Sequence, residues 1–360
     1  MARELVCGAL VLELDRQTIE AAEGDTILDA ARAHGVYIPT LCYHRKTGQS
    51  AACRSCAVEV EGARGLVMAC STPVREGMVV RTDSDAVLRA RRTVVDLLLS
   101  EGRHDCLSCE VSGTCELQDA AYRLGIEHAS ESRTDPLLPL DLSHPMIVRD
   151  PNKCIHCFRC VKGCNDVVVN GVLDMAFRSQ ASTVVADQDV PLGESSCLAC
   201  GECVQLCPTG ALIERKAMRL GRVWNLDEVR TTCPYCGVGC QVVLHVDRSR
   251  NRVVRVTGAE GVAPNDGMLC VKGRFGYDFA SSPRRLARPL LRRNGRLEPV
   301  GWDEALDFTA TRLREIREAH GPDSICGITS SRDTNENAYA AQKFMRGVVG
   351  TNNIDNCART

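Results

Sequence analysis

Apolar and polar residues alternate near the N-terminus and then change to helical spacing. Residues 5–14 alternate as in a strand, and residues 26–35 have the spacing of a short helix closed by Gly35. A second strand is expected over residues 57–61, and a long helical segment covers residues 85–100. This order predicts a small sheet with one helix, followed by a longer helix.

The pattern becomes α/β from Trp302 onward. Asp303 is expected to cap a helix that ends at Gly321. The apolar face of this helix would carry Leu306, Ala310, Leu313 and Ile316. A short buried strand is expected over residues 324–329, then a polar loop over residues 330–335 and a second helix. This order places the loop at the carboxyl end of the strand, where α/β sheets bind ligands.

Composition excludes several classes of protein. The 360 residues carry 44 Lys plus Arg and 46 Asp plus Glu, so the net charge of −2 lacks the basic excess of a nucleic-acid binder. A hydrophobic content of 44% excludes a disordered chain. The N-terminus lacks a signal-peptide pattern, and no stretch reaches the roughly 18 uncharged apolar residues of a membrane span. We therefore expect a cytoplasmic protein with no nucleic-acid partner and no direct membrane insertion.

The 22 cysteines are the strongest chemical signal. Their C-x-x-C spacing in a chain without a leader favours metal sites over disulfides. Nineteen of them form five groups: Cys42, Cys53, Cys56 and Cys70; Cys106, Cys109 and Cys115; Cys154, Cys157, Cys160 and Cys164; Cys197, Cys200, Cys203 and Cys207; and Cys233, Cys236, Cys240 and Cys270. Outside the groups, Cys7 and Cys326 lie in apolar runs and are expected to be core residues. Cys357 stands near the end of the sequence.

The third and fourth groups share the spacing C-x2-C-x2-C-x3-C of two-cluster ferredoxins, in which the last cysteine of each run binds the other cluster. One [4Fe–4S] cluster is therefore assigned to Cys154, Cys157, Cys160 and Cys207. The second is assigned to Cys197, Cys200, Cys203 and Cys164. Zinc would leave the paired repeat unexplained. For the first group, four thiolates suit zinc or a [2Fe–2S] cluster, and spacing alone does not decide between them.

The first group resembles a known cluster domain. The segment AACRSCAVEVEGARGLVMACSTPV is similar to the [2Fe–2S] domain of the large peripheral subunit of complex I, of iron-only hydrogenases and of related formate dehydrogenases. This resemblance implies a β-grasp domain with one [2Fe–2S] cluster.

The second group resembles the next site in the same families, a [4Fe–4S] cluster held by three cysteines and one histidine. There the histidine lies four positions before the first cysteine, but this chain has Gly102 at that position. His104, two residues before Cys106, is the nearest imidazole and the candidate fourth ligand. The alternative is a solvated loop histidine.

The fifth group, together with Met268–Arg274, resembles the start of the molybdenum or tungsten bis-pyranopterin oxidoreductases. The resemblance implies a [4Fe–4S] cluster beside a pyranopterin guanine dinucleotide cofactor, with Lys272 as the electron relay between them. An exposed charge is the alternative for Lys272. Gly237 and Gly239 lack the strand, helix and third glycine of a dinucleotide fingerprint.

Residues 351–360 resemble the segment that, in cytoplasmic formate dehydrogenases, precedes the metal-binding selenocysteine or cysteine and its following histidine. We therefore expect a UGA codon read as selenocysteine after Thr360, followed by the remaining pterin-binding domains. A deliberate boundary or a fragmented gene would give the same ending. Without that metal ligand, the 360-residue chain alone is expected to be inactive.

Together these resemblances identify the chain as the N-terminal part of the catalytic (alpha) subunit of an NAD(P)-linked formate dehydrogenase. They imply one [2Fe–2S] cluster, four [4Fe–4S] clusters and a molybdenum or tungsten bis-pyranopterin centre. Formate would be oxidised to CO2, and electrons would pass to a flavin-bearing diaphorase subunit, with ferredoxin or hydrogenase subunits as further partners. Three alternatives stay open: a complex I large subunit, an iron-only hydrogenase and a non-enzymatic multi-cluster electron carrier.

The expected fold class is an α+β multidomain iron–sulfur protein. Its segments are a [2Fe–2S] domain (1–83), a [4Fe–4S] domain with three cysteines and one histidine (84–127), a linker (128–148), a two-cluster ferredoxin-like domain (149–218), a [4Fe–4S] domain of molybdopterin oxidoreductases (226–282) and an incomplete α/β pterin-binding domain (283–360).

Overall fold

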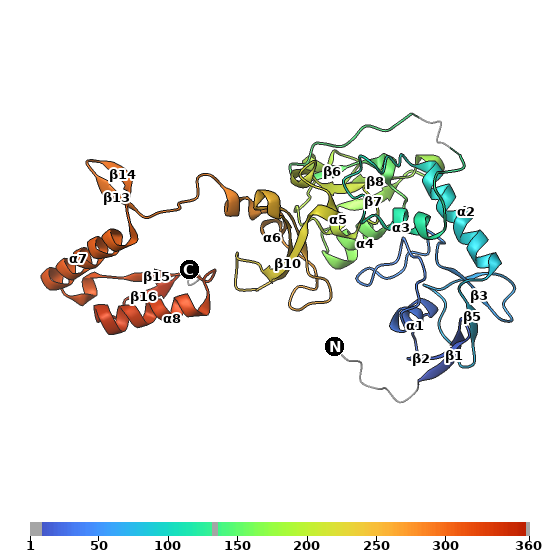
Figure 1. Ribbon diagram of the computed structural model, residues 1–360, viewed down its shortest axis with the longest axis horizontal. Helices are drawn as coiled ribbons and strands as arrows, with labels where there is room; N and C mark the ends of the chain where they lie inside the picture. The colour runs from blue at the N-terminus through green and yellow to red at the C-terminus, as the bar shows by residue number, and fades with distance from the viewer. Residues whose placement is uncertain (1–8, 132–135, 358–360) are drawn as a thin grey trace. The chain divides into compact units, whose positions relative to one another are not determined.

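The computed structural model describes residues 9–131 and 136–357 (Figure 1). The chain divides into two compact units, Met1–Asp227 and Glu228–Thr360, which are described separately below. Cys7 lies outside the described residues. Within the described ranges, no helix combines the length and the apolar character needed to cross a bilayer.

The chain begins with a mixed five-stranded sheet in the order β2-β1-β5-β3-β4, in which β1 and β5 are parallel. Its strands are β1 (Leu10–Leu14), β2 (Gln17–Ala21), β3 (Ala57–Val60), β4 (Val67–Met68) and β5 (Val79–Arg81). A single helix, α1 (Ile27–Ala33), packs on the sheet. The arrangement is the β-grasp fold expected from the sequence.

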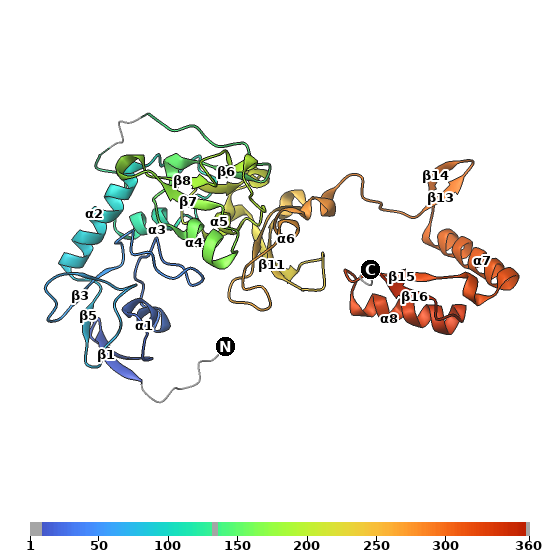
Figure 2. The same cartoon turned by 180° about the vertical axis from the view of Figure 1, so that it is seen from behind.

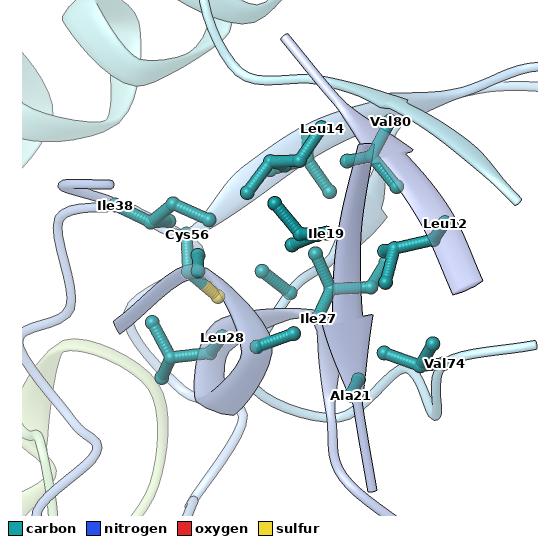
Figure 3. Packing of buried hydrophobic residues seen from close by; sticks show 14 of the residues in the cluster. Leu12, Leu14, Ile19, Ala21, Ile27, Leu28, Ile38, Cys56, Val74 and Val80 are labelled. Carbon is teal, nitrogen blue, oxygen red and sulfur yellow. The ribbon is translucent and has the colours of Figure 1, made fainter. Parts of the chain in front are cut away.

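Helix α1 forms as the sequence predicts. Thr26 caps it and exchanges hydrogen bonds with Asp29 in a capping box, and Gly35 follows the helix with φ +74°. The alternation of β1 and β2 turns their apolar side chains toward the fully buried Ile27 and Leu28 of α1. Figure 3 shows this core, in which the ligand candidate Cys56 is packed among the aliphatic side chains.

Two helices follow, α2 (Asp85–Glu101) and α3 (Glu116–Arg123). Ser84 caps α2 by accepting a hydrogen bond from the amide of Val87. The buried Arg91 of α2 donates hydrogen bonds to the carbonyl oxygens of Ala57 and Thr82. These bonds attach α2 to the sheet of the first domain.

The next segment consists of two ribbons and two short helices. The antiparallel ribbons pair β6 (Ile147–Arg149) with β9 (Leu212–Glu214), and β7 (Leu173–Ala176) with β8 (Thr183–Ala186). The helices are α4 (Arg159–Lys162) and α5 (Glu202–Leu206). Single helical turns lie at η1 (Pro151–Lys153), η2 (Gly163–Val167), η3 (Ser179–Ala181), η4 (Leu192–Glu194), η5 (Arg215–Ala217) and η6 (Val223–Asn225).

Helices α4 and α5 are close neighbours because Gly163, directly after α4, has no side chain. A Cβ atom at Gly163 would lie 2.3 Å from Leu206 Cδ1, so any larger residue would displace the buried Leu206 side chain. The close approach brings the two cysteine runs together.

The second unit starts with a three-stranded sheet in the order β10-β11-β12. Its elements are β10 (Asp227–Thr232), β11 (Gln241–Asp247), η7 (Arg248–Arg250), β12 (Arg252–Gly258), α6 (Val271–Phe275) and η8 (Tyr277–Ser281). A hairpin and an α/β segment follow: β13 (Leu290–Arg293), β14 (Arg296–Pro299), α7 (Trp302–His320), η9 (Pro322–Ser324), β15 (Gly327–Thr329), α8 (Asn335–Phe344), η10 (Met345–Val349) and β16 (Ile354–Asn356).

The α/β segment has the predicted order of elements: strands β15 and β16 are parallel, and α8, which connects them, contacts β15 (Figure 2). The start of the first helix and the length and burial of the strand differ from the prediction. Helix α7 begins one residue before Asp303, so Gly301 is the N-cap and Asp303 lies in the first turn, where its charge favours the helix without capping it. The strand over residues 324–329 is shorter than predicted, and it is not buried.

Cys326 is exposed, so its assignment to the core was wrong. Ile328 is likewise 78% exposed. An apolar run predicts burial only when other elements cover it, and no described residue covers this face of the β15–β16 pair.

Candidate metal centres

The four cysteines of the first group are buried and lie together: Cys42, Cys53, Cys56 and Cys70. The Sγ atoms of Cys56 and Cys70 are 3.3 Å apart. The pKa of Cys42 is lowered to about 5, because the Cys53 thiol donates a hydrogen bond to its sulfur. Burial opposes this shift, and the backbone amides of Cys53, Ala52 and Ser50 add to it.

This donor set fits a metal group that is held by thiolates. The small residues Ser50, Ala51 and Ala52 let backbone amides approach the sulfur of Cys42, and amides aimed at a sulfur stabilise its negative charge. Ala51 and Arg54 have φ of +51° and +55°, a region that non-glycine residues seldom adopt. The backbone conformation that turns these amides toward the sulfur is therefore energetically unfavourable for the loop itself.

The three cysteines of the second group, Cys106, Cys109 and Cys115, lie close enough for their sulfurs to interact electrostatically. His104 is nearby but turned toward the helix α2, where its Nε2 donates a 3.2 Å hydrogen bond to the carbonyl oxygen of Leu98. Burial lowers the pKa of His104, which favours the neutral imidazole. A neutral ring with Nε2 protonated leaves Nδ1 free to accept a metal, so the side chain has the protonation state of a ligand.

Two residues of the following domain lie against the sulfur of Cys109. Lys153 Nζ is 3.7 Å from Cys109 Sγ, and it also lies 3.3 Å from a carboxylate oxygen of Asp105. A Cβ atom at Gly210 would lie 3.0 Å from the same sulfur. The second cysteine group is therefore enclosed partly by the two-cluster domain.

The two middle runs exchange their last cysteines in space. A cavity is lined by Cys154, Cys157, Cys160 and Cys207, so the last cysteine of the second run lies with the first run. Conversely, Cys164 of the first run is in the electrostatic neighbourhood of Cys197, together with Cys200. The first ligand set assigned from the spacing is therefore complete in the structure, and the second is matched at Cys164, Cys197 and Cys200. Cluster binding at each set stays a prediction.

Both runs also share an unusual backbone conformation. His156 and Phe158 have φ of +50° and +65°, and the equivalent Ala199 and Gly201 have φ of +53° and +71°. In the second run the amide of Ala199 lies 3.4 Å from the sulfur of Cys197, and the amide of His156 likewise donates to Cys154. An amide that donates to a cysteine sulfur stabilises the thiolate, so both loops fit a cluster bound by thiolates.

Burial favours the protonated thiols of Cys154, Cys157 and Cys160. It raises the pKa of Cys154 to about 11 and that of Cys157 to about 12, and it also raises the pKa of Cys160. Binding a metal group here must release protons.

The four cysteines of the fifth group lie close enough for their sulfurs to interact electrostatically: Cys233, Cys236, Cys240 and Cys270. The amide of Cys233 donates a 2.8 Å hydrogen bond to the carbonyl oxygen of Cys240, which closes the loop. Lys272 lies in the first turn of α6, two residues after Cys270, and is exposed. Its position next to the group is compatible with the relay role and equally with an exposed charge.

The fifth group also neighbours the polar loop after β15. A Cβ atom at Gly237 would lie 3.6 Å from the carbonyl oxygen of Ser331. The sulfur of Cys357, just after β16, lies 3.4 Å from Ser330 Oγ, and this hydrogen bond lowers the pKa of the thiol. The carboxyl ends of the two parallel strands thus lie beside the cluster loop, at the edge where α/β sheets bind ligands.

Among residues 9–131 and 136–357, no three His, Cys, Asp or Glu side chains are arranged to hold a single metal ion.

Three charged residues inside or beside the cysteine runs have positions that the cysteine pattern alone did not predict: Arg159, Glu202 and Lys153. The sequence could have indicated that these side chains lie near the sites only through their closeness to the cysteines along the chain.

Five family models match consecutive parts of the chain. They describe a 2Fe-2S iron–sulfur cluster binding domain (residues 9–85), the NADH-ubiquinone oxidoreductase-G iron–sulfur binding region (91–130), a 4Fe-4S dicluster domain (153–211), the molybdopterin oxidoreductase Fe4S4 domain (226–282) and molybdopterin oxidoreductase (285–360). The chain belongs to the family of multidomain iron–sulfur oxidoreductases.

Particular relatives come from several enzymes. The chain is 39% identical over 349 residues to the NADPH-Fe(3+) oxidoreductase subunit alpha of Geobacter sulfurreducens, a match that covers 97% of this chain and 40% of that protein. It is 40% identical over 353 residues to an NADH-quinone oxidoreductase subunit of Rhizobium meliloti, covering 96% of this chain and 40% of the relative.

A protein of Staphylococcus aureus named "Putative formate dehydrogenase" is 32% identical over 392 residues, covering 97% of this chain and 39% of the relative. Among solved structures, a chain of an NAD+-reducing [NiFe]-hydrogenase matches with 34% identity and a TM-score of 0.56, covering 59% of this chain and 91% of that chain. The chain spans about 40% of the length of the curated relatives.

Proposed function

We propose that the chain is the electron-transferring N-terminal part of a formate dehydrogenase subunit. The observation that carries this proposal is the position of Ser330 and Ser331, in the loop after β15, and of Cys357, just after β16, beside the fifth cysteine group. The resemblance of residues 351–360 to formate dehydrogenases and the relative of that name in Staphylococcus aureus support formate as the substrate.

Formate oxidation yields CO2, one proton and two electrons. A molybdenum or tungsten pyranopterin centre, when bound, supplies the two-electron chemistry, and iron–sulfur clusters carry electrons one at a time. The residues of this chain would hold the clusters through the five cysteine groups and tune them by burial and hydrogen bonding. Lys272 is proposed as the electron relay between the fifth cluster and the pterin.

Electrons must leave the chain through a partner. The NAD+-reducing hydrogenase and the NADH-linked relatives support a nicotinamide-using partner. We propose a flavin-bearing diaphorase subunit that binds the N-terminal cluster domains. A selenocysteine or cysteine metal ligand after Thr360 also stays a proposal, and sequencing the gene beyond codon 360 tests it.

A second candidate is a nicotinamide-linked oxidoreductase that does not use formate. It is favoured by the identities of 39% and 40% to the NADPH-Fe(3+) and NADH-quinone subunits, which exceed the 32% to the Staphylococcus aureus protein.

The deciding experiment uses the product of the full gene, purified without oxygen together with its co-purifying subunits. We expect bound molybdenum or tungsten, a flavin-bearing partner, and formate-dependent reduction of a viologen dye and of NAD+ or NADP+. Nicotinamide-dependent reduction of Fe(III) or a quinone, with the metal bound and no response to formate, would instead establish the second candidate. Rapid nicotinamide reduction by the isolated subunit would contradict the proposed diaphorase.

A further inference from the structure

Three cysteine groups share one hydrophobic core. The core joins apolar residues of three domains to ligand candidates of three sites: Leu41, Cys42, Cys53, Leu117, Ile155 and Cys157, with the partly buried Cys115 packed against them. The sites for the [2Fe–2S] cluster, the three-cysteine cluster and the first ferredoxin-like cluster therefore meet in one packed region.

Arg159 lies in this region and joins its own two-cluster domain to the two domains before it. It stands between Cys157 and Cys160 at the start of α4, and its side chain is 2% exposed. Its Nη1 and Nη2 atoms donate hydrogen bonds of 2.5 and 2.7 Å to the two carboxylate oxygens of Glu116. Nη2 also donates a 3.1 Å hydrogen bond to the carbonyl oxygen of Thr40.

The two acceptors are themselves next to ligand candidates. Thr40 precedes Cys42 by two residues, and Glu116 directly follows Cys115. One guanidinium group therefore connects residues that lie within two positions of ligand candidates at three separate sites. Its planar fork holds a carboxylate in one fixed geometry, which a lysine ammonium cannot do.

The charge of Arg159 is retained in spite of its burial. A guanidinium is protonated at any pH that proteins tolerate, and the paired hydrogen bonds to the carboxylate of Glu116 compensate for its burial. The sulfurs of Cys157 and Cys207 also lie in its electrostatic neighbourhood. A permanent positive charge thus stands beside the first ferredoxin-like site.

A second contact joins two of the sites through the backbone. The amide of Glu116 donates a 2.9 Å hydrogen bond to the carbonyl oxygen of Pro208. Pro208 follows Cys207, and Glu116 follows Cys115. A short series of covalent bonds and one hydrogen bond therefore runs from a ligand of one site to a ligand of the other.

We propose that Arg159 is a positioning residue for electron transfer, which fixes the three cluster sites against one another and raises the electron affinity of the cluster at Cys154, Cys157, Cys160 and Cys207. The inference rests on the proposed function in requiring that clusters are bound, but not on formate as the substrate. In each transfer step one electron leaves a reduced cluster and reduces its neighbour, and no bond or proton moves.

A buried ion pair is by itself weak evidence of a role in stability, so the test needs a readout that stability alone would not change. Arg159→Met removes the charge and the fork, whereas Arg159→Lys keeps the charge and loses the fork. Arg123→Met is the control, because Arg123 makes an exposed ion pair with Asp119 on the same helix as Glu116. The holoprotein is reduced with dithionite, and the potential of each cluster is measured by titration with electron paramagnetic resonance.

We expect Arg159→Met to lower the reduced-to-oxidised ratio of this one cluster about tenfold at a fixed potential, which is 59 mV for a one-electron couple. The cluster at Cys197, Cys200, Cys203 and Cys164 should keep its potential. Arg159→Lys should restore the potential but slow the transfer to the three-cysteine cluster in freeze-quench experiments.

An unchanged potential and transfer rate in Arg159→Met, with full iron and sulfide content, would overturn the inference, and so would an equal shift of every cluster. If Arg159→Met does not retain its clusters, Arg159→Lys and Glu116→Gln decide in its place. Wild-type transfer rates in both of these variants would also overturn the inference. Failure of the proposed function appears separately, as a lack of formate activity in the wild type.

Discussion

The imidazole of His104 fills the space that a side chain at Gly102 would occupy. A Cβ atom at Gly102 would lie 2.4 Å from His104 Nε2 and 2.8 Å from its Cε1. The related sites have their histidine at the position of Gly102. In this chain the ring of His104 reaches the Cβ position of Gly102 from two residues further along, and we infer that His104 can substitute for the histidine of the related sites.

We therefore predict that His104→Ala weakens the signal of one [4Fe–4S] cluster and leaves the others. The double variant Gly102→His with His104→Ala should recover much of that signal, because Gly102 has φ −107° and ψ 169°, which any residue can adopt. Asn152 would have to yield slightly, since its carbonyl oxygen lies 3.0 Å from the new Cβ. An unaltered spectrum in His104→Ala would place the fourth ligand elsewhere.

The close approach of Gly210 to Cys109 gives a second prediction. In Gly210→Ala the new methyl group would stand 3.0 Å from Cys109 Sγ and 3.2 Å from Val111 Cγ2, so the sulfur must move. We expect a selective loss or broadening of the Cys106, Cys109 and Cys115 cluster signal. Gly65→Ala is the matched control, because nothing lies within 4 Å of its Cβ position. Identical spectra for the two variants would contradict the prediction.

The metal content tests the whole set of cysteine groups. One [2Fe–2S] and four [4Fe–4S] clusters require about 18 iron atoms per chain, with an equal amount of acid-labile sulfide. Protein prepared without oxygen should approach these values by colorimetric analysis. Stoichiometric zinc with little sulfide would show that the groups are zinc sites.

His245 makes the sheet of the second unit sensitive to acid. It is 5% exposed, and its Nε2 lies 3.0 Å from Thr257 Oγ1. Burial, assisted by the charge of Arg255, lowers its pKa to about 4. Glu228 lies 3.6 Å from Nδ1 but is 70% exposed, and it does not offset the burial.

Because the unfolded imidazole binds its proton near pH 6.5 and the folded one only near pH 4, the unfolded state holds more protons in this interval. The contribution of His245 to stability is fully present above pH 6.5 and is lost as the pH falls toward 4, with a total on the order of 3 kcal/mol. The protection factors for hydrogen exchange in β11 and β12, which remove the intrinsic pH dependence of exchange, should therefore fall over this range. His245→Gln should flatten the dependence, and an equally steep dependence in that variant would contradict the prediction.

The sequence was most informative where function requires a fixed spacing along the chain. The cysteine runs predicted the family of the protein, and the structure brings Cys207 to the first run and Cys164 to the second as the spacing implies. The end of α1 before Gly35 was equally local. Such features depend on residues a few positions apart, and the amino-acid pattern therefore contains them.

Features that depend on distant segments were missed or wrong. Nothing near Arg159 in the sequence indicates that it would meet Glu116 and Thr40, which are 43 and 119 positions away. Lys153 beside Cys109 is a similar case. Cys326 was expected in the core because its neighbours are apolar, but burial depends on what covers a strand, and the local pattern does not contain that information.

The core that contains Leu41, Leu117 and Ile155 also has a consequence for maturation. Side chains there pack against the sulfurs of candidate cluster ligands, so a cluster that arrives after folding would have to displace this packing. We therefore expect delivery of iron and sulfide to keep pace with folding of the segment that ends at α4. We expect a shortage of clusters in the cell to produce a misassembled, protease-sensitive chain instead of a folded protein awaiting its metals.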